Sequence, residues 1–133
     1  MSGYLRHSYN ALNSVYREGA YVTIALSDCL SNMDCGEKPI VTRIVYGVIE
    51  RHEEFSYFIK KLCKIQPKPV IRVILRLGMY LIKYMDNIPN YAAVNSIVEL
   101  TKAVGKGQVA SFVNGVLKKF IDVNNDLPKG KEL

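Results

Sequence analysis

The chain of 133 residues is long enough for about one domain with its own core, and its 49% hydrophobic and 23% charged residues are ordinary for a globular protein. The longest apolar stretch, from Val70 to Met85, is interrupted by charged side chains, and the N-terminus resembles neither a signal nor a transit peptide, so we expect a cytoplasmic protein without membrane spans. The formal net charge of +6 favours a polyanionic partner.

Apolar residues recur at intervals of three and four along nearly the whole chain, which is the spacing of amphipathic helices. In chain order we expect helices over residues 4–18 and 21–30, one long helix or two shorter ones over 39–62 with a possible break at 50–53, and further helices over 70–85, 91–104 and 108–121. Gly19 should end the first helix, and Pro39 suits a first helical turn. The segment 41–49 is rich in Val and Ile, but it lacks two-fold alternation and hairpin turns, so helix is favoured over strand.

The sequence therefore predicts an all-α fold, a single compact bundle of about six or seven helices. We expect residues 1–123 to form the domain. The polar residues 124–133 should form a frayed tail.

No catalytic, cofactor or metal site is predicted. Cys29, Cys35 and Cys63 lack the spacing of zinc ligands. The glycines around Lys106 match no nucleotide-binding motif and are expected to stop a helix, although Lys106 itself could contact a phosphate. We therefore do not expect an enzyme.

Basic residues are concentrated in one part of the chain. Between Phe55 and Met85 there are seven basic residues and no acid: Lys60, Lys61, Lys64, Lys68, Arg72, Arg76 and Lys83. This distribution favours nucleic-acid binding, the alternative being a solvated lysine-rich surface without a special purpose. Arg76 lies in the most apolar helix and needs a partner there. We expect a structural ion pair with Glu99, the only acid between Tyr91 and Phe120.

Three motifs resemble the NusB fold family in order and spacing: LRLGMY at 75–80, IPNYAAVNSIVEL at 88–100 and FVNGVL at 112–117. This family comprises the antitermination factor NusB and the N-terminal domain of RsmB-type methyltransferases, which make 5-methylcytosine in small-subunit ribosomal RNA. Residues 19–21, 45–48 and 80–85 are closer to the RsmB type, and residues 126–133 resemble the start of its linker to an absent catalytic domain. Where the family usually has Asn-Glu-Ala this chain has Asn95-Ser96-Ile97, so no function of that glutamate is carried over.

Asn95 and Asn114 are polar residues within apolar helical faces, so each is expected to hydrogen-bond to backbone or to a neighbouring helix. Gly115 should allow another helix to approach closely. We interpret these three residues as structural.

The resemblance implies a domain that binds RNA, most specifically one that docks ribosomal RNA for a methyltransferase. The N-terminal basic segment that contributes to RNA binding in this family is thin here, with Arg6, His7 and Arg17 alone. Tyr4 and Tyr91 could stack on bases, although packing is the favoured use of each. The predicted RNA-binding residues are Arg6, His7, Lys60, Lys61, Lys64, Lys68, Arg72, Lys106, Lys118 and Lys119.

Two alternatives stay open. One is a free-standing antitermination factor that binds leader RNA together with a ribosomal protein. The other is an interaction domain that packs against its own C-terminal methyltransferase domain and has little affinity for RNA.

Overall fold

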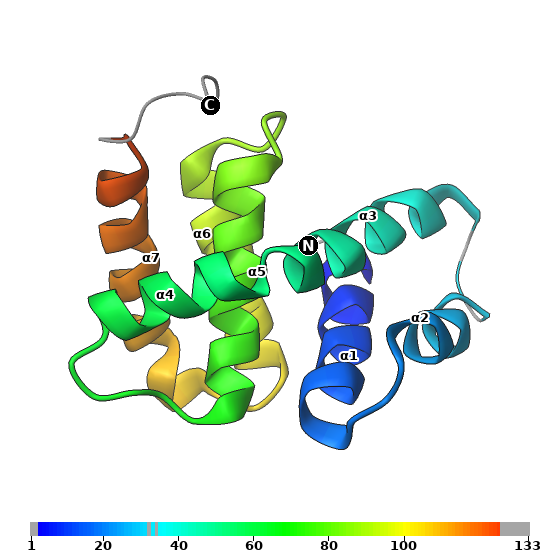
Figure 1. Ribbon diagram of the computed structural model, residues 1–133. Helices are drawn as coiled ribbons and strands as arrows, with labels where there is room; N and C mark the ends of the chain where they lie inside the picture. Colours follow the sequence, from blue (N-terminus) through cyan, green and yellow to red (C-terminus); the bar gives the residue numbers. More distant parts are fainter. Residues whose placement is uncertain (1–2, 32, 34, 126–133) are drawn as a thin grey trace.

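The computed structural model describes residues 3–31, 33 and 35–125, and these residues contain helices and no strand. The all-α prediction is confirmed, and seven α-helices follow one another within these described residues (Figure 1). They are α1 (Gly3–Glu18), α2 (Val22–Leu30), α3 (Lys38–Glu50), α4 (His52–Leu62), α5 (Pro69–Tyr84), α6 (Asn90–Ala103) and α7 (Ala110–Asn125). Two short 3₁₀ turns, η1 (Cys35–Glu37) and η2 (Gly107–Val109), precede α3 and α7.

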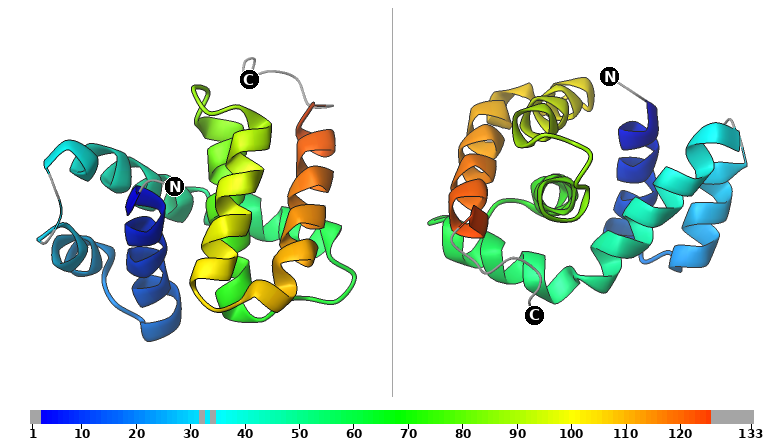
Figure 2. Two further views of the ribbon diagram at one scale, coloured as in Figure 1. Left: turned by 180° about the vertical axis from the view of Figure 1, so that it is seen from behind. Right: turned by 90° about the horizontal axis from the view of Figure 1, so that it is seen from above.

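Helix α5 is the centre of the molecule. Twelve of its sixteen residues are buried, and it packs against α1, α3, α4, α6 and α7. Seen from above, α5 lies between α1 on one side and α7 on the other (Figure 2). Two groups of helices, α1–α3 and α4 with α6 and α7, thus share one buried helix.

Glycine and proline set most helix ends, as the sequence predicts. Gly19 and Gly105 have positive φ angles of 74° and 81°, a conformation that glycine adopts without a steric penalty and that ends α1 and α6. Pro39 and Pro69 lie in the first turns of α3 and α5, where a missing N–H costs nothing. The helical conformation is interrupted at Arg51, between α3 and α4. The segment expected to form one long helix or two shorter ones therefore forms two helices.

Two glycines allow helices to approach closely, but Gly115 is not one of them. A Cβ atom on Gly47 would lie 2.3 Å from Cε1 of Tyr80, and one on Gly78 would lie 2.8 Å from Cδ1 of Leu117. A Cβ on Gly115 would have no atom within 4 Å. The prediction for Gly115 is therefore wrong, because this glycine faces open space.

Helix α7 continues to Asn125, so residues 124 and 125, expected in the polar tail, are helical. The rest of that predicted tail, 126–133, lies outside the described residues. Among the described residues, no helix is both long and apolar enough to cross a membrane.

Candidate nucleic-acid interface

The end of α4 carries exposed lysines because the helix is amphipathic. Phe55, Phe58 and Ile59 are buried, and the ring of Phe58 packs edge-on against Phe120 of α7 at a centroid distance of 5.1 Å. Lys60 and Lys61 occupy the last turn on the exposed side, where positive charge is favourable beside the helix C-terminus. Because α4 packs on α7, the C-terminal end of α4 lies beside α7.

Lysines from two distant parts of the chain meet at this junction. Lys64 and Lys119 line one hollow between the end of α4 and α7. Burial raises the pKa of the neighbouring Cys63 thiol, and the positive charge of Lys119 partly opposes that rise. We call the five exposed lysines on these two segments the lysine group: Lys60, Lys61, Lys64, Lys118 and Lys119. Among the described residues none of the five forms a salt bridge.

The other predicted contact residues are spread more widely. Lys68 is exposed at the start of α5, whereas Arg72 is half-buried and its Nη1 donates to the carbonyl oxygen of Pro67 at 2.6 Å. Lys106 lies half-buried in the connection between α6 and η2. Arg6 and His7 belong to α1, which lies on the far side of α5 from α7 (Figure 2). The structure therefore does not unite Arg6 and His7 with Lys118 and Lys119.

The two tyrosines considered for base stacking differ. Tyr91 is 72% exposed at the start of α6. Tyr4 is half-buried, and its burial, followed by the charge of Glu37, raises its pKa. Of these two rings, only that of Tyr91 is open to a stacking partner.

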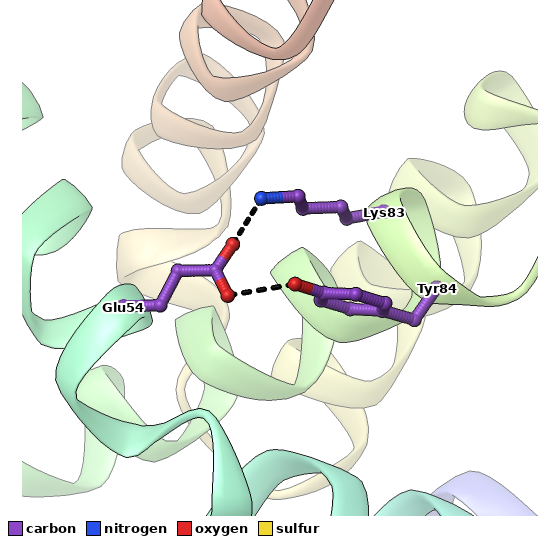
Figure 3. A network of polar contacts seen from close by, with 3 residues as sticks. All are labelled: Glu54, Lys83 and Tyr84. Carbon is purple, nitrogen blue, oxygen red and sulfur yellow. Dashed lines mark hydrogen bonds and ion pairs between the residues drawn. The ribbon is translucent and has the colours of Figure 1, made fainter. Parts of the chain in front are cut away.

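Lys83 is engaged in a polar network that joins α4 to the end of α5 (Figure 3). Its ammonium group pairs with Oε2 of Glu54, and the hydroxyl of Tyr84 donates to Oε1 of Glu54 at 2.7 Å. Burial is the largest single effect and acts to lower the pKa of Lys83, but the hydrogen bond and charge of Glu54 together with Tyr84 outweigh it, so the pKa is raised. The guanidinium of Arg51 covers the ring of Tyr84 at 4.2 Å. We conclude that Lys83 has a structural role.

Arg76 does not pair with Glu99, so that prediction is wrong. The side chain of Arg76, only 7% exposed, points to α1 and α4, where its Nη2 donates to Oγ of Ser56 at 3.3 Å and its guanidinium lies 4.6 Å from the ring centroid of Tyr16. Glu99 is exposed, and its Oε2 lies 3.8 Å from Nζ of Lys102 on the same helix. A hydroxyl and an aromatic face replace the expected carboxylate.

A small polar cluster surrounds this arginine. The ring of His52 stacks on Tyr16, and the Tyr16 hydroxyl lies 3.0 Å from its Nδ1, while Oγ of Ser56 lies 3.5 Å from its Nε2. Burial and then the charge of Arg76 lower the pKa of His52. The cluster connects α1, α4 and α5 and leaves Nε of Arg76 buried without a partner among the described residues.

The asparagine prediction also fails. Asn95 is exposed and Asn114 is half-exposed, and neither amide forms a side-chain hydrogen bond within the described part of the chain. Water can reach both side chains, so neither amide requires a hydrogen-bond partner within the protein.

Sequence reasoning missed two apolar residues beside the lysine group. Ile65 is 84% exposed in the connection after α4, and Phe112 of α7 is 38% exposed. The signal for Ile65 is a large apolar residue isolated in a segment rich in Lys and Pro. Phe112 gives no such signal, because it fits the apolar spacing of α7 and only the position of α4 leaves it uncovered.

No group of three or more potential metal ligands is found among the described residues. Cys29 and Cys63 are free thiols, and Sγ of Cys29 donates to the carbonyl oxygen of His7 at 3.3 Å.

Comparison with known proteins identifies relatives of two kinds. The chain is 32% identical to a probable ribosomal RNA small subunit methyltransferase B of Synechocystis over 82% of this chain and 26% of that protein, and the Bacillus subtilis counterpart is also 32% identical, over 81% and 25%. It is 38% identical to the transcription antitermination protein NusB of Bacillus velezensis over 71% of this chain and 77% of that protein. The chain spans about a quarter of the length of the methyltransferases it matches.

The NusB family matches residues 6–122, which is nearly all of the described helical structure. The resemblance suggested by the three sequence motifs is thereby confirmed. This chain belongs to the NusB family.

Proposed function

We propose that this domain binds RNA and that it docks small-subunit ribosomal RNA for a 5-methylcytosine methyltransferase of the RsmB type, without taking part in catalysis itself. The lysine group carries the proposal. Its five ammonium groups are exposed, come from two segments brought together by packing, and form no salt bridge among the described residues. Exposed lysines whose charge is not neutralised by a carboxylate are suited to phosphates, which position an RNA without reading its sequence.

The choice of ribosomal RNA rests on the methyltransferase relatives, whose alignments cover about four fifths of this chain. A free-standing antitermination factor that binds leader RNA with a ribosomal protein is the second candidate. The alignment with the Bacillus velezensis NusB protein favours this candidate, because it covers 77% of that protein's length. In the methyltransferase case, a catalytic domain of the same protein is an expected partner.

The test is fluorescence anisotropy with a small-subunit ribosomal RNA hairpin, a single-stranded leader RNA and an unrelated RNA over a salt series. We expect affinity to fall steeply with salt, and preference for the hairpin supports the methyltransferase role, whereas preference for the leader supports antitermination. Absence of binding to all three at low salt contradicts RNA binding and leaves an interaction domain.

Charge variants locate the contact. The double substitution Lys64→Gln and Lys119→Gln should lower the slope of log affinity against log salt by about 1.4, at about 0.7 per lost phosphate contact on single strands. Lys38→Gln with Lys102→Gln removes the same charge from α3 and α6 and should leave the slope nearly unchanged. Equal effects of the two pairs would show that only net charge matters.

A further inference from the structure

We infer that the hollow between α4 and α7 is a binding site for one unstacked nucleobase of single-stranded RNA. This inference rests on the proposed RNA binding. The hollow has a volume of about 360 Å³, within the range of about 300–1,000 Å³ typical of small-ligand pockets. Its lining includes Lys64 and Ile65, which follow α4, and Ser111, Phe112, Gly115 and Lys119 of α7.

The walls of the hollow include apolar side chains that the described residues leave partly uncovered. The ring of Phe112 is 38% exposed and Ile65 is 84% exposed, although residues of these types are usually buried. Gly115 contributes no side chain, and the space where its Cβ would lie is empty to 4 Å. Aromatic rings beside such space are the surfaces on which bases of single strands stack.

Charge at the rim selects a nucleotide over an apolar peptide. Lys64 and Lys119 line the hollow, and no carboxylate of a described residue does. Two ammonium groups beside an apolar floor match a nucleotide, whose base is flat and whose flanking phosphates are negative. The hydroxyl of Ser111 offers a hydrogen-bonding group to a polar base edge.

Duplex RNA does not satisfy these walls, because its bases are stacked and paired. A single strand or the loop of a hairpin can turn one base out of its stack, so the hollow requires an unpaired base, which both kinds of RNA can supply. The lysine group would supply affinity through phosphates, and the hollow would supply a requirement for a base. These two contributions can be separated by experiment.

The absence of tryptophan from the chain provides a reporter. In the Phe112→Trp variant the single indole lies in the hollow, and we expect its emission to be quenched by a single-stranded RNA of twelve nucleotides of mixed sequence. The matched control is Tyr21→Trp, at a residue directly before α2 that is 77% exposed and does not line the hollow. Quenching of Phe112→Trp by this RNA, but not by the same RNA with abasic riboses, is the expected result.

Filling the hollow gives an independent measurement. Gly115→Leu places a side chain in empty space and should lower affinity for the twelve-nucleotide RNA between about 5-fold and 150-fold, the range that corresponds to one lost base–aromatic stack. Asn95→Leu, on an exposed position of α6, should change affinity less than about 2-fold. Phe112→Ala should match Gly115→Leu, and thermal unfolding checks that each variant is folded.

The outcomes separate this inference from the proposed function. If normal and abasic RNA bind alike and Gly115→Leu binds as the unsubstituted chain does, the base site is wrong while salt-dependent RNA binding stands. If no RNA binds at low salt, the proposed function fails and the base site fails with it.

Discussion

At the scale of single residues, two helical glycines with opposite surroundings make a matched pair. Gly47→Ala places a Cβ 2.3 Å from Cε1 of Tyr80, a ring that is 5% exposed and has no room to move. We expect a loss of about 1–3 kcal/mol of unfolding free energy from overpacking. Gly115→Ala meets no atom within 4 Å. We expect a gain of about 0.5–1 kcal/mol, because alanine restricts the unfolded chain and favours helix. Urea unfolding followed by circular dichroism measures both, and shifts in the same direction would contradict the interpretation.

His52 should make stability depend on pH. Its pKa in the folded state is lowered by burial and by Arg76, so the unfolded chain binds more protons in the range near the ordinary histidine value of about 6.5. Stability is then fully present above that value and is lost as pH falls through it towards the lower folded pKa.

The comparison variant is His52→Asn, which keeps a polar atom near Nδ1 but does not titrate in this range. Between about pH 7.5 and pH 5.5 the unsubstituted chain should lose more unfolding free energy than the variant. His7 is present in both chains, so its contribution cancels. Parallel stability profiles would show that His52 does not cause the dependence.

Residue partners were less predictable than residue positions. Burial of Arg76 follows from the apolar residues around it in the sequence, but its partners Ser56 and Tyr16 are neutral and give no charge signal. Glu99 is the only acid between Tyr91 and Phe120 in the sequence, and yet it is exposed. The base site was not predictable either, since Ile65 and Phe112 become neighbours only when α4 packs on α7.

At the scale of helices, most boundaries could be predicted because they depend on local chemistry. Gly19, Gly105, Pro39 and Pro69 act through their own backbone conformations. The break at Arg51 has no glycine or proline. It depends on packing on either side of Arg51, which is why the sequence left one helix and two as alternatives.

Helix α2 should be the least protected helix of the described structure. Only Ala25 and Leu26 are buried, and α2 packs against α1 and α3 at the edge of the molecule, whereas α5 is buried along most of its length. Few buried apolar contacts mean a low free energy of local opening. Native-state hydrogen exchange with mass spectrometry should show amides of α2 exchanging well before those of α5. Equal protection of the two helices would contradict this expectation.

At the scale of the whole molecule, the shared helix α5 decides whether the two groups of helices unfold together. Leu12 of α1 and Leu117 of α7 are both fully buried. These two helices lie on opposite sides of α5 (Figure 2). Replacing either with alanine should cost about 2–5 kcal/mol. Because α5 is part of both packing surfaces, each substitution should shift one transition for the entire chain rather than split it. Urea unfolding followed by far-ultraviolet circular dichroism and by tyrosine fluorescence should therefore give coincident curves for both variants. An early transition in Leu12→Ala that leaves most helical signal intact would mean that α1–α3 unfolds separately, and that α5 is stable with α4, α6 and α7 alone.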